Sequence, residues 1–190
     1  MMLNLVGCAT VAPKRVDDVC CIFNEYPDWY TAAKASEAKW QVPIPVQMAI
    51  MHQESSFRGD AKPPRQFCLG FIPWKRPTTA CGYTQAVNST WRLYQKSSGN
   101  HFASRSSFKD ATDFIGWYAR HAHRELGIAP SNAYALYLAY HEGLRGYARR
   151  TYLRKPWLIK VAKKVSLRSR IYQKQLKDCK STLPKPRWWS

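Results

Sequence analysis

Apolar side chains recur at helical spacing through most of the chain and seldom alternate with the period of two that marks a half-buried strand. Val46, Ala49 and Ile50 form an i, i+3, i+4 stripe, which is typical of one buried helix face. Pro45 suits the first turn of this helix, and Glu54 lies near its carboxyl end. The pattern predicts a mainly α fold.

Helical patterning recurs in further segments, and residues that commonly start or stop helices lie at several of their ends. Asn88 or Ser89, and later Ser131 or Asn132, can each cap a helix start, and Gly127 can end a helix. The further predicted helices are about 29–39, 90–97, 110–126, one that carries Tyr134, Tyr137, Leu138 and Tyr140, and a basic C-terminal helix at about 158–176.

Between residues 58 and 82 the helical pattern gives way to Pro, Gly, Lys and aromatic residues. A loop of this length inside a compact domain is usually functional. We therefore expect a functional loop or a small subdomain in this part of the chain.

Composition and charge narrow the class of protein. The chain has 190 residues, of which 45% are hydrophobic and 14% aromatic, so it is too apolar for an intrinsically disordered protein. Its net charge is +18, and residues 145–190 carry 15 Lys and Arg against one acid, Asp178. Such a field attracts polyanions, namely nucleic acid, acidic lipid headgroups or an anionic cell-wall polymer, or else it only keeps the surface solvated.

The first residues and the cysteines bear on the compartment. Leu5-Val6-Gly7-Cys8 resembles the lipobox of bacterial lipoproteins, in which the cysteine is lipidated. Seven residues precede Cys8, so either the chain starts inside a longer signal or the match is chance. The resemblance implies a lipid anchor at Cys8, and Ala9 favours the outer membrane on the periplasmic side of a Gram-negative envelope.

The other five cysteines match no zinc-binding spacing. Cys68 and Cys81 bracket a short Pro- and aromatic-rich segment, which suits a loop-closing disulfide. Cys179 can pair with Cys20 or with Cys21 and so join the two ends of the chain. The alternative is a cytosolic chain, which can keep all six cysteines as free thiols.

Three short stretches could carry chemistry. Glu54 stands in His52-Gln53-Glu54-Ser55-Ser56-Phe57, near the negative end of a helix dipole, which raises the pKa of a carboxyl. Walled by apolar side chains, such a carboxyl stays protonated and can act as a general acid; otherwise it is an ordinary surface glutamate. The second stretch is Gly82-Tyr83-Thr84-Gln85-Ala86, and the third is Ala139-Tyr140-His141-Glu142-Gly143.

In this order the three stretches resemble the lytic transglycosylases of the soluble-lytic-transglycosylase and goose-type lysozyme superfamily. That family has a Glu-Ser pair at a helix end, then a Gly-x-x-Gln element, then Ala-Tyr-Asn-x-Gly, and the resemblance covers about residues 40–146. It implies a lysozyme-like α-helical domain. The expected organisation is a remnant lipoprotein signal at 1–8, a linker at 9–27, the transglycosylase domain at 28–180 with an insertion at about 58–81, and a basic aromatic tail at 181–190.

The chain departs from the family pattern in two places. Glu54 and Gln85 are 31 residues apart, a longer spacing than usual, which predicts a disulfide-pinned flap carrying Trp74 beside the glycan groove. The usual Asn after Tyr140 is replaced by His141, and Glu142 adds a second carboxylate. Because neighbouring residues on a helix point about 100° apart, Glu142 is not expected to be catalytic.

The resemblance implies cleavage of the β-1,4 bond between N-acetylmuramic acid and N-acetylglucosamine without water. Glu54 would act first as acid and then as base, giving 1,6-anhydro ends. Tyr140 would orient Glu54, Gln85 with the backbone near Tyr83 would hold the sugar amide, and Ser55 would brace the helix end. Gly82 and His141 complete the implied sugar-binding set.

No metal or cofactor is predicted, and His121 and His123, two apart on one helix, do not share a face. The implied partners are peptidoglycan glycan strands and, through Cys8, a membrane. The alternative is an inactive lysozyme-like module that binds peptidoglycan as part of an envelope-spanning complex. A nucleic-acid-binding protein is disfavoured, because the chain lacks a helix-turn-helix or aromatic ribonucleoprotein motif.

Overall fold

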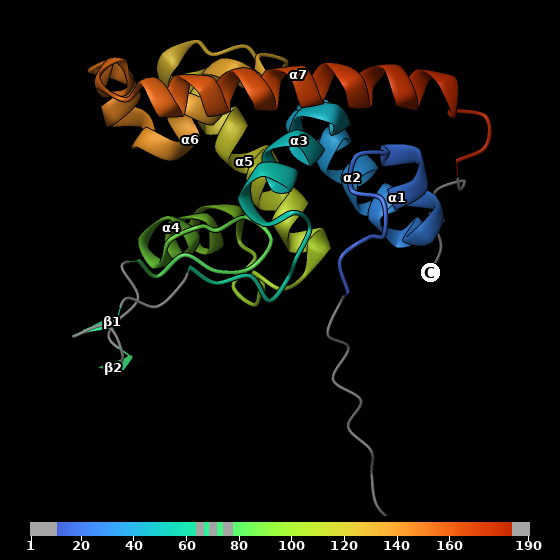
Figure 1. The fold of residues 1–190 in the computed structure, drawn as a ribbon, viewed down its shortest axis with the longest axis horizontal. Helices are drawn as coiled ribbons and strands as arrows, with labels where there is room; N and C mark the ends of the chain where they lie inside the picture. The colour runs from blue at the N-terminus through green and yellow to red at the C-terminus, as the bar shows by residue number, and fades with distance from the viewer. Residues whose placement is uncertain (1–10, 64–66, 69–71, 74–77, 184–190) are drawn as a thin grey trace, which may run out of the picture.

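The computed structural model describes residues 11–63, 67–68, 72–73 and 78–183, and within these the fold is mainly α, as predicted (Figure 1). A two-stranded antiparallel ribbon pairs Phe67 with Pro73 and Cys68 with Ile72. In chain order the elements are α1 (Val19–Glu25), α2 (Pro27–Trp40), α3 (Ile44–Ser55), β1 (Phe67–Cys68), β2 (Ile72–Pro73), α4 (Asn88–Ser98), α5 (Phe108–Leu126), α6 (Ala133–Ala148), the 3-10 helix η1 (Thr151–Arg154) and α7 (Pro156–Asp178).

Local chemistry sets several helix ends. Asn132 caps α6 by accepting a hydrogen bond from the Ala135 N–H, and Gly127 ends α5 in the left-handed conformation, as the sequence predicts. Ser107 caps α5 through the Asp110 N–H. The expected cap of α4 differs, because Asn88 is already the first helical residue and its side chain accepts a hydrogen bond from Arg105.

Helix α5 lies at the centre of the bundle and packs against α2, while α7 crosses one side of the molecule over α3 and α6 (Figure 1). A Cβ atom at Gly116 would lie 2.5 Å from the Trp40 ring and 2.7 Å from Ser36 Oγ, so glycine there allows α2 and α5 to approach closely. Trp29 stacks on Phe108 with ring centroids 4.0 Å apart. These contacts fix the frame in which α3 presents its carboxyl end.

Helix α7 is amphipathic, and its buried stripe explains why so basic a segment folds onto the domain. Leu158, Ala162, Val165 and Tyr172 are buried at i, i+4, i+7 and i+14, whereas the lysines between them are exposed. Within the described residues, none of the helices combines the length and the apolarity that crossing a bilayer requires.

The segment 9–27, expected to be a linker, contains α1, and this prediction is wrong for its second half. Val19, Ile22 and Phe23 are fully buried at i, i+3 and i+4, and the Asp18 carboxylate caps the helix by accepting from the Cys20 and Cys21 N–H groups. These three residues do follow helical spacing. The helix has only seven residues, however, and two turns are too few for the pattern to be recognised. The folded domain therefore includes α1.

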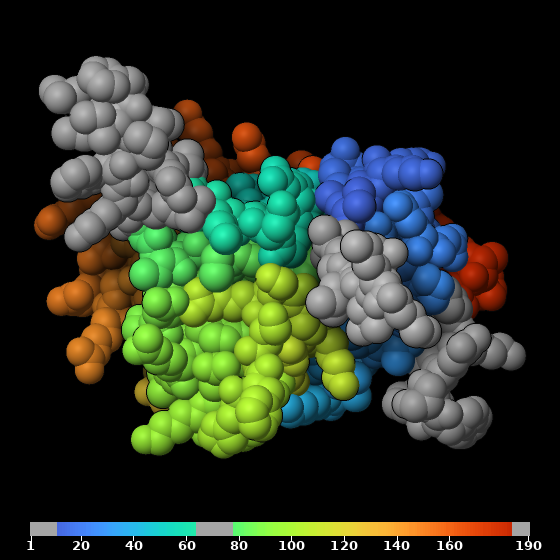
Figure 2. Space-filling view, turned by 90° about the horizontal axis from the view of Figure 1, so that it is seen from below, coloured from blue at the N-terminus to red at the C-terminus, as the bar shows by residue number. Residues whose placement is uncertain are grey.

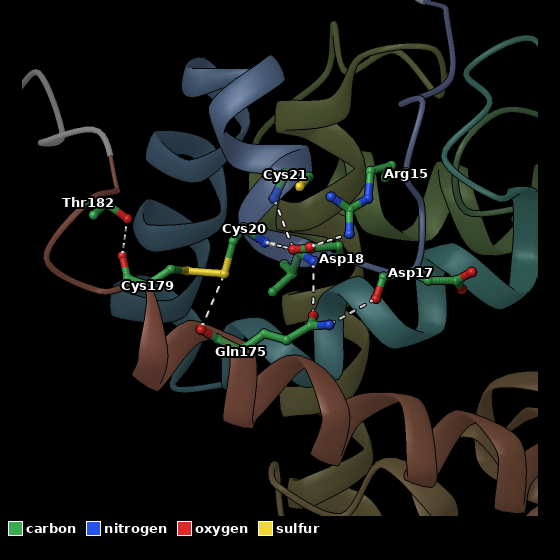
Figure 3. Close-up of a disulfide and its surroundings, with 9 residues drawn as sticks. Arg15, Asp17, Asp18, Cys20, Cys21, Gln175, Cys179 and Thr182 are labelled. Atoms are coloured by element: carbon green, nitrogen blue, oxygen red, sulfur yellow. Dashed lines mark hydrogen bonds and ion pairs between the residues drawn. A yellow bond between two sulfur atoms is a disulfide. The ribbon is translucent and has the colours of Figure 1, made fainter.

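A disulfide joins Cys20 in α1 to Cys179 at the end of α7, as Figure 3 shows. Gln175 reinforces the same junction, because its side chain accepts a hydrogen bond from the Val19 N–H and donates one to the Asp17 carbonyl. One of the two predicted pairings of Cys179 is thus confirmed, and Cys21 is a free thiol.

The predicted Cys68–Cys81 disulfide is wrong for this structure. Cys81 is a free thiol, and its sulfur accepts a hydrogen bond from the Arg105 guanidinium at 3.1 Å. The side chain of Cys68, together with Trp74, Cys8 and the tail from residue 184, lies outside the described residues. The short intervening segment suggested a closed loop, but the positively charged Arg105 neighbour offers Cys81 a different partner.

We expect Cys179→Ala to lower the free energy of unfolding by about 3 kcal/mol, because the disulfide closes nearly the whole chain into one loop. In a domain of this size that corresponds to roughly 6–12 °C in the melting temperature. Thermal unfolding with and without reductant measures the effect. Cys21→Ala is the matched control and should unfold like the unmodified chain, so equal losses in both variants would contradict the pairing.

Candidate active site

Glu54 stands one residue before the end of α3, and the chain turns sharply after it. Ser56 and Phe57 both adopt left-handed backbone conformations, with φ of 50° and 61°. Such angles are unfavourable for non-glycine residues and persist only where packing enforces them. The Phe57 side chain is fully buried and supplies that packing, so the turn holds the end of α3 in place.

A cleft of about 670 Å³ opens beside Glu54. Aromatic side chains of α5 and α6 form one wall, and the segment 78–87 with α4 forms another. Seen from below, residues following α3 lie directly against those of about 80–110 (Figure 2). The residues that line the cleft include Glu54, Gln85, Trp117, Tyr140, His141 and Glu142.

Burial raises the pKa of the Glu54 carboxyl to about 7. A hydrogen bond from the Tyr137 hydroxyl acts in the opposite direction and lowers this pKa, but burial is the larger effect. The carboxyl is therefore protonated in a large fraction of molecules at neutral pH. A group with a pKa near the working pH can both give and take a proton, which is the property that a residue alternating between acid and base needs.

The tyrosine that contacts Glu54 is not the predicted one. Tyr140 donates its hydroxyl hydrogen to the Thr84 carbonyl at 2.7 Å, and it is Tyr137 that hydrogen-bonds the carboxyl. The two tyrosines lie three residues apart and share a helix face, so both approach the site. Tyr140 still feels the charge of Glu54, since burial first and the carboxylate second raise the pKa of its phenol.

The Gly82–Gln85 turn lies against the end of α3. Gly82 has φ of 74°, and a Cβ atom there would meet the Arg105 carbonyl at 2.2 Å, so only glycine fits. Gln85 lines the cleft, while its Nε2 donates to the carbonyls of Ala61 and Gly82. The side-chain amide is thereby held in one orientation.

Tyr83 is not among the residues that line the cleft, whereas the resemblance implies that the backbone near it holds the sugar amide. Its ring is fully buried and packs edge-on against Trp29 and Phe108, and its N–H donates to the Arg105 carbonyl. Ser55 donates its hydroxyl to the Tyr83 carbonyl at 2.8 Å. Ser55 and Tyr83 thus join the end of α3 to the Gly82–Gln85 turn from behind.

Glu142 reaches the rim of the cleft in a very different environment from Glu54. Its carboxylate accepts hydrogen bonds from the Lys155 ammonium at 2.7 Å, from the Thr151 hydroxyl and from His141. Burial alone would raise its pKa, but these three partners outweigh burial and lower the pKa to about 2. Glu142 is a permanent anion and cannot serve as an acid near neutral pH.

Helix α6 bends immediately after Glu142, where Gly143 adopts φ of 73° and ψ of 159°. Such angles are almost confined to glycine, which explains why the third motif ends in this residue. The bend occurs at the cleft rim, and Gly143 itself lines the cleft.

His52 and Gln53, the neighbours of Glu54 in sequence, face elsewhere. Both line a separate groove of about 440 Å³ between α3, α7 and Asp17. Of the predicted site residues, the cleft therefore brings together Glu54, Gln85, Tyr140 and His141, with Gly82 and Ser55 behind them. Within the described ranges, no group of three or more His, Cys, Asp or Glu side chains is arranged to hold a metal ion.

Sequence reasoning missed Tyr137, Thr151 and Lys155. For Tyr137 a signal existed, since Tyr134, Tyr137 and Tyr140 recur every three residues along one helix. Thr151 and Lys155 belong to η1 and its exit, which meet Glu142 only after the bend at Gly143. Nothing in the spacing of Thr151 and Lys155 along the sequence indicates that they contact Glu142.

Comparison with known families agrees with the α-helical fold. Residues 1–179 match the family described as "Transglycosylase SLT domain", and the chain belongs to that family of peptidoglycan-acting transglycosylases. Comparison with curated proteins and with solved structures returned no match.

The pKa of Glu54 predicts a pH-dependent effect of Glu54→Gln on stability. A carboxyl whose pKa rises from 4.5 unfolded to about 7 folded makes the fold less stable as the pH rises from 4.5 to 7. The amide has no such penalty, so Glu54→Gln should stabilise the fold by roughly 1–3 kcal/mol at pH 8 and little at pH 4. Urea unfolding at both pH values measures this.

Glu125→Gln serves as the control, because Glu125 is an exposed glutamate near the end of α5. This variant should change stability little at either pH. A Glu54→Gln gain that is the same at pH 4 and pH 8 would contradict the raised pKa.

Proposed function

We propose that this protein is a lytic transglycosylase that cleaves the β-1,4 bond between N-acetylmuramic acid and N-acetylglucosamine in peptidoglycan. The observation that carries the proposal is the desolvated carboxyl of Glu54, which has a pKa of about 7 and lies at the wall of an aromatic cleft in a chain of the transglycosylase family. Most glycosidases use two carboxyl groups. Here the other carboxyl at the cleft, Glu142, is a fixed anion.

In the first step, protonated Glu54 gives its proton to the glycosidic oxygen as the bond to the muramic C1 breaks. The oxygen of the substrate's own 2-acetamido group bonds to C1 and takes up the developing positive charge. Glu54 is now a carboxylate and hydrogen-bonds with Tyr137, whose hydroxyl stabilises the charged form.

In the second step, the Glu54 carboxylate takes the proton of the muramic 6-hydroxyl. The 6-oxygen then bonds to C1, the acetamido oxygen leaves C1, and a 1,6-anhydro ring closes. Glu54 is protonated again, so atoms and charge balance over the cycle without water. Gln85 offers the sugars its Oε1 as an acceptor, since both Nε2 hydrogens are used by the Ala61 and Gly82 carbonyls, and the aromatic face of Trp117 can pack against apolar ring faces.

We further propose that the protein acts on the periplasmic side of a Gram-negative envelope as an outer-membrane lipoprotein anchored through Cys8. Support comes from the Leu5–Cys8 lipobox-like sequence, from Ala9, and from a disulfide that suits an oxidising compartment. A place within an envelope-spanning complex would be compatible with this location.

Glu54→Gln should reduce the release of soluble fragments from purified sacculi by about 10²–10⁴-fold, because the amide cannot transfer the proton. Mass spectrometry of the products formed by the unmodified chain should find 1,6-anhydro ends. Reducing ends would indicate hydrolysis instead. Binding of sacculi without cleavage by the unmodified chain would favour the inactive-module alternative.

The rate of cleavage should fall as the pH rises through about 7, because the first step requires protonated Glu54. Tyr137→Phe removes a hydrogen bond that lowers this pKa, so the fall should move to higher pH in that variant. Tyr140→Phe is the matched control, since its hydroxyl bonds Thr84, and it should leave the position of the fall unchanged. An unchanged position of the fall in Tyr137→Phe, or an equal shift in Tyr140→Phe, would contradict this role of the Tyr137 hydroxyl.

A further inference from the structure

His141 lines the same cleft as Glu54, at the bend of α6, and its side chain is 35% exposed. Its Nδ1 lies 3.1 Å from Glu142 Oε1, and its ring packs edge-on against Trp157 with centroids 5.1 Å apart. The imidazole is therefore held from two sides, by a hydrogen bond and by an aromatic contact, while part of it faces the cleft.

The partner of Nδ1 decides which nitrogen of His141 carries the hydrogen. An ionised carboxylate only accepts hydrogen bonds, so Nδ1 must be the donor. In the neutral imidazole the other nitrogen, Nε2, is then an acceptor. Within the described part of the chain, Nε2 has no hydrogen-bond partner.

Glu142 is itself fixed by residues on the far side of the α6 bend. Lys155 shares Oε1 with His141, while the Thr151 hydroxyl bonds Oε2 and also reaches the Gly146 carbonyl. Only 3% of the Glu142 side chain is exposed. The carboxylate is thus an immobile acceptor, and its orientation is set before any ligand enters the cleft.

We propose that His141 contacts the glycan and accepts a hydrogen bond at Nε2 from a sugar hydroxyl or acetamido N–H, and that Glu142 is the positioning residue that fixes this tautomer. The inference rests on the proposed function, since it assigns a ligand to the same cleft. It differs from what an asparagine would provide at this position, because a side-chain amide offers both donor and acceptor. In this chain, Nε2 of His141 therefore binds groups of the substrate that donate a hydrogen bond.

The test uses the full chain with Glu54→Gln, which binds without turnover, and chitohexaose as an N-acetylated oligosaccharide probe. Nitrogen NMR of histidine-labelled protein at pH 8, above the usual pKa of an imidazole, identifies the tautomer. We expect Nδ1 of His141 to carry the hydrogen and the Nε2 signal to shift when chitohexaose is added. His141→Phe keeps a planar aromatic ring but lacks Nε2, so it should raise the dissociation constant about 10-fold.

Two variants distinguish a role of Glu142 in positioning His141 from a role in stabilising the fold. Adding Glu142→Gln should weaken the preference for the Nδ1–H tautomer and raise the dissociation constant about as much as His141→Phe does. Lys155→Met should lower the melting temperature but keep the tautomer, because Glu142 remains an anion at pH 8. Tautomer preference and affinity that are kept in Lys155→Met but lost when Glu142→Gln is added to it would support direct positioning by Glu142.

An Nε2–H tautomer, or an Nε2 signal that does not move although chitohexaose binds, would overturn this inference and leave the proposed function standing. An unchanged dissociation constant in His141→Phe would overturn it as well. If chitohexaose does not bind the chain at all, this inference is overturned, and the release of fragments from sacculi decides separately on the proposed function.

Discussion

The burial of one carboxyl, that of Glu54, is the constraint on which the structure of the site depends. Removing a carboxyl from water disfavours its charged form, and only one hydrogen bond, from Tyr137, opposes this effect. The surrounding fold enforces the position: α3 ends in a strained turn locked by Phe57, and Ser55 fastens that end to the Gly82–Gln85 turn. Burying this carboxyl lowers the stability of the fold. The same burial leaves Glu54 with a proton that it can donate at neutral pH.

Two glutamates at one cleft illustrate how environment rather than residue type assigns chemical roles. Glu54 is surrounded by apolar and phenolic groups and has a pKa of about 7, whereas Glu142, held by Lys155, Thr151 and His141, has a pKa of about 2. One group can exchange protons, and the other can only attract and orient. The bend at Gly143 makes this division possible, because it brings η1 and the start of α7 to the cleft rim.

Much of this arrangement could be predicted from sequence, and the misses have physical causes. Long apolar stripes and caps such as Asn132 predicted α2 to α7, while α1 was missed because its stripe is only three residues. The glycan groove beside Glu54 was implied only by the family resemblance of the three ordered stretches, at 54–55, 82–85 and 139–143. Which tyrosine reaches Glu54 depends on how α6 packs, which spacing cannot decide, since Tyr137 and Tyr140 share a face. Likewise, Cys81 is a free thiol that accepts a hydrogen bond from Arg105. Sequence spacing could not predict this contact, because the two residues are 24 positions apart.

The central claim is that the Glu54 carboxyl has a pKa of about 7 in the folded protein, so that it is about half protonated at neutral pH. Carbon NMR of the glutamate carboxyl groups, followed from pH 3 to pH 9 in the full chain and in Glu54→Gln, tests it directly. The account predicts one carboxyl signal that titrates near pH 7 and is missing from the Glu54→Gln spectrum. If every glutamate signal present in the unmodified chain titrates near its ordinary value of about 4.3 or below, the account is contradicted.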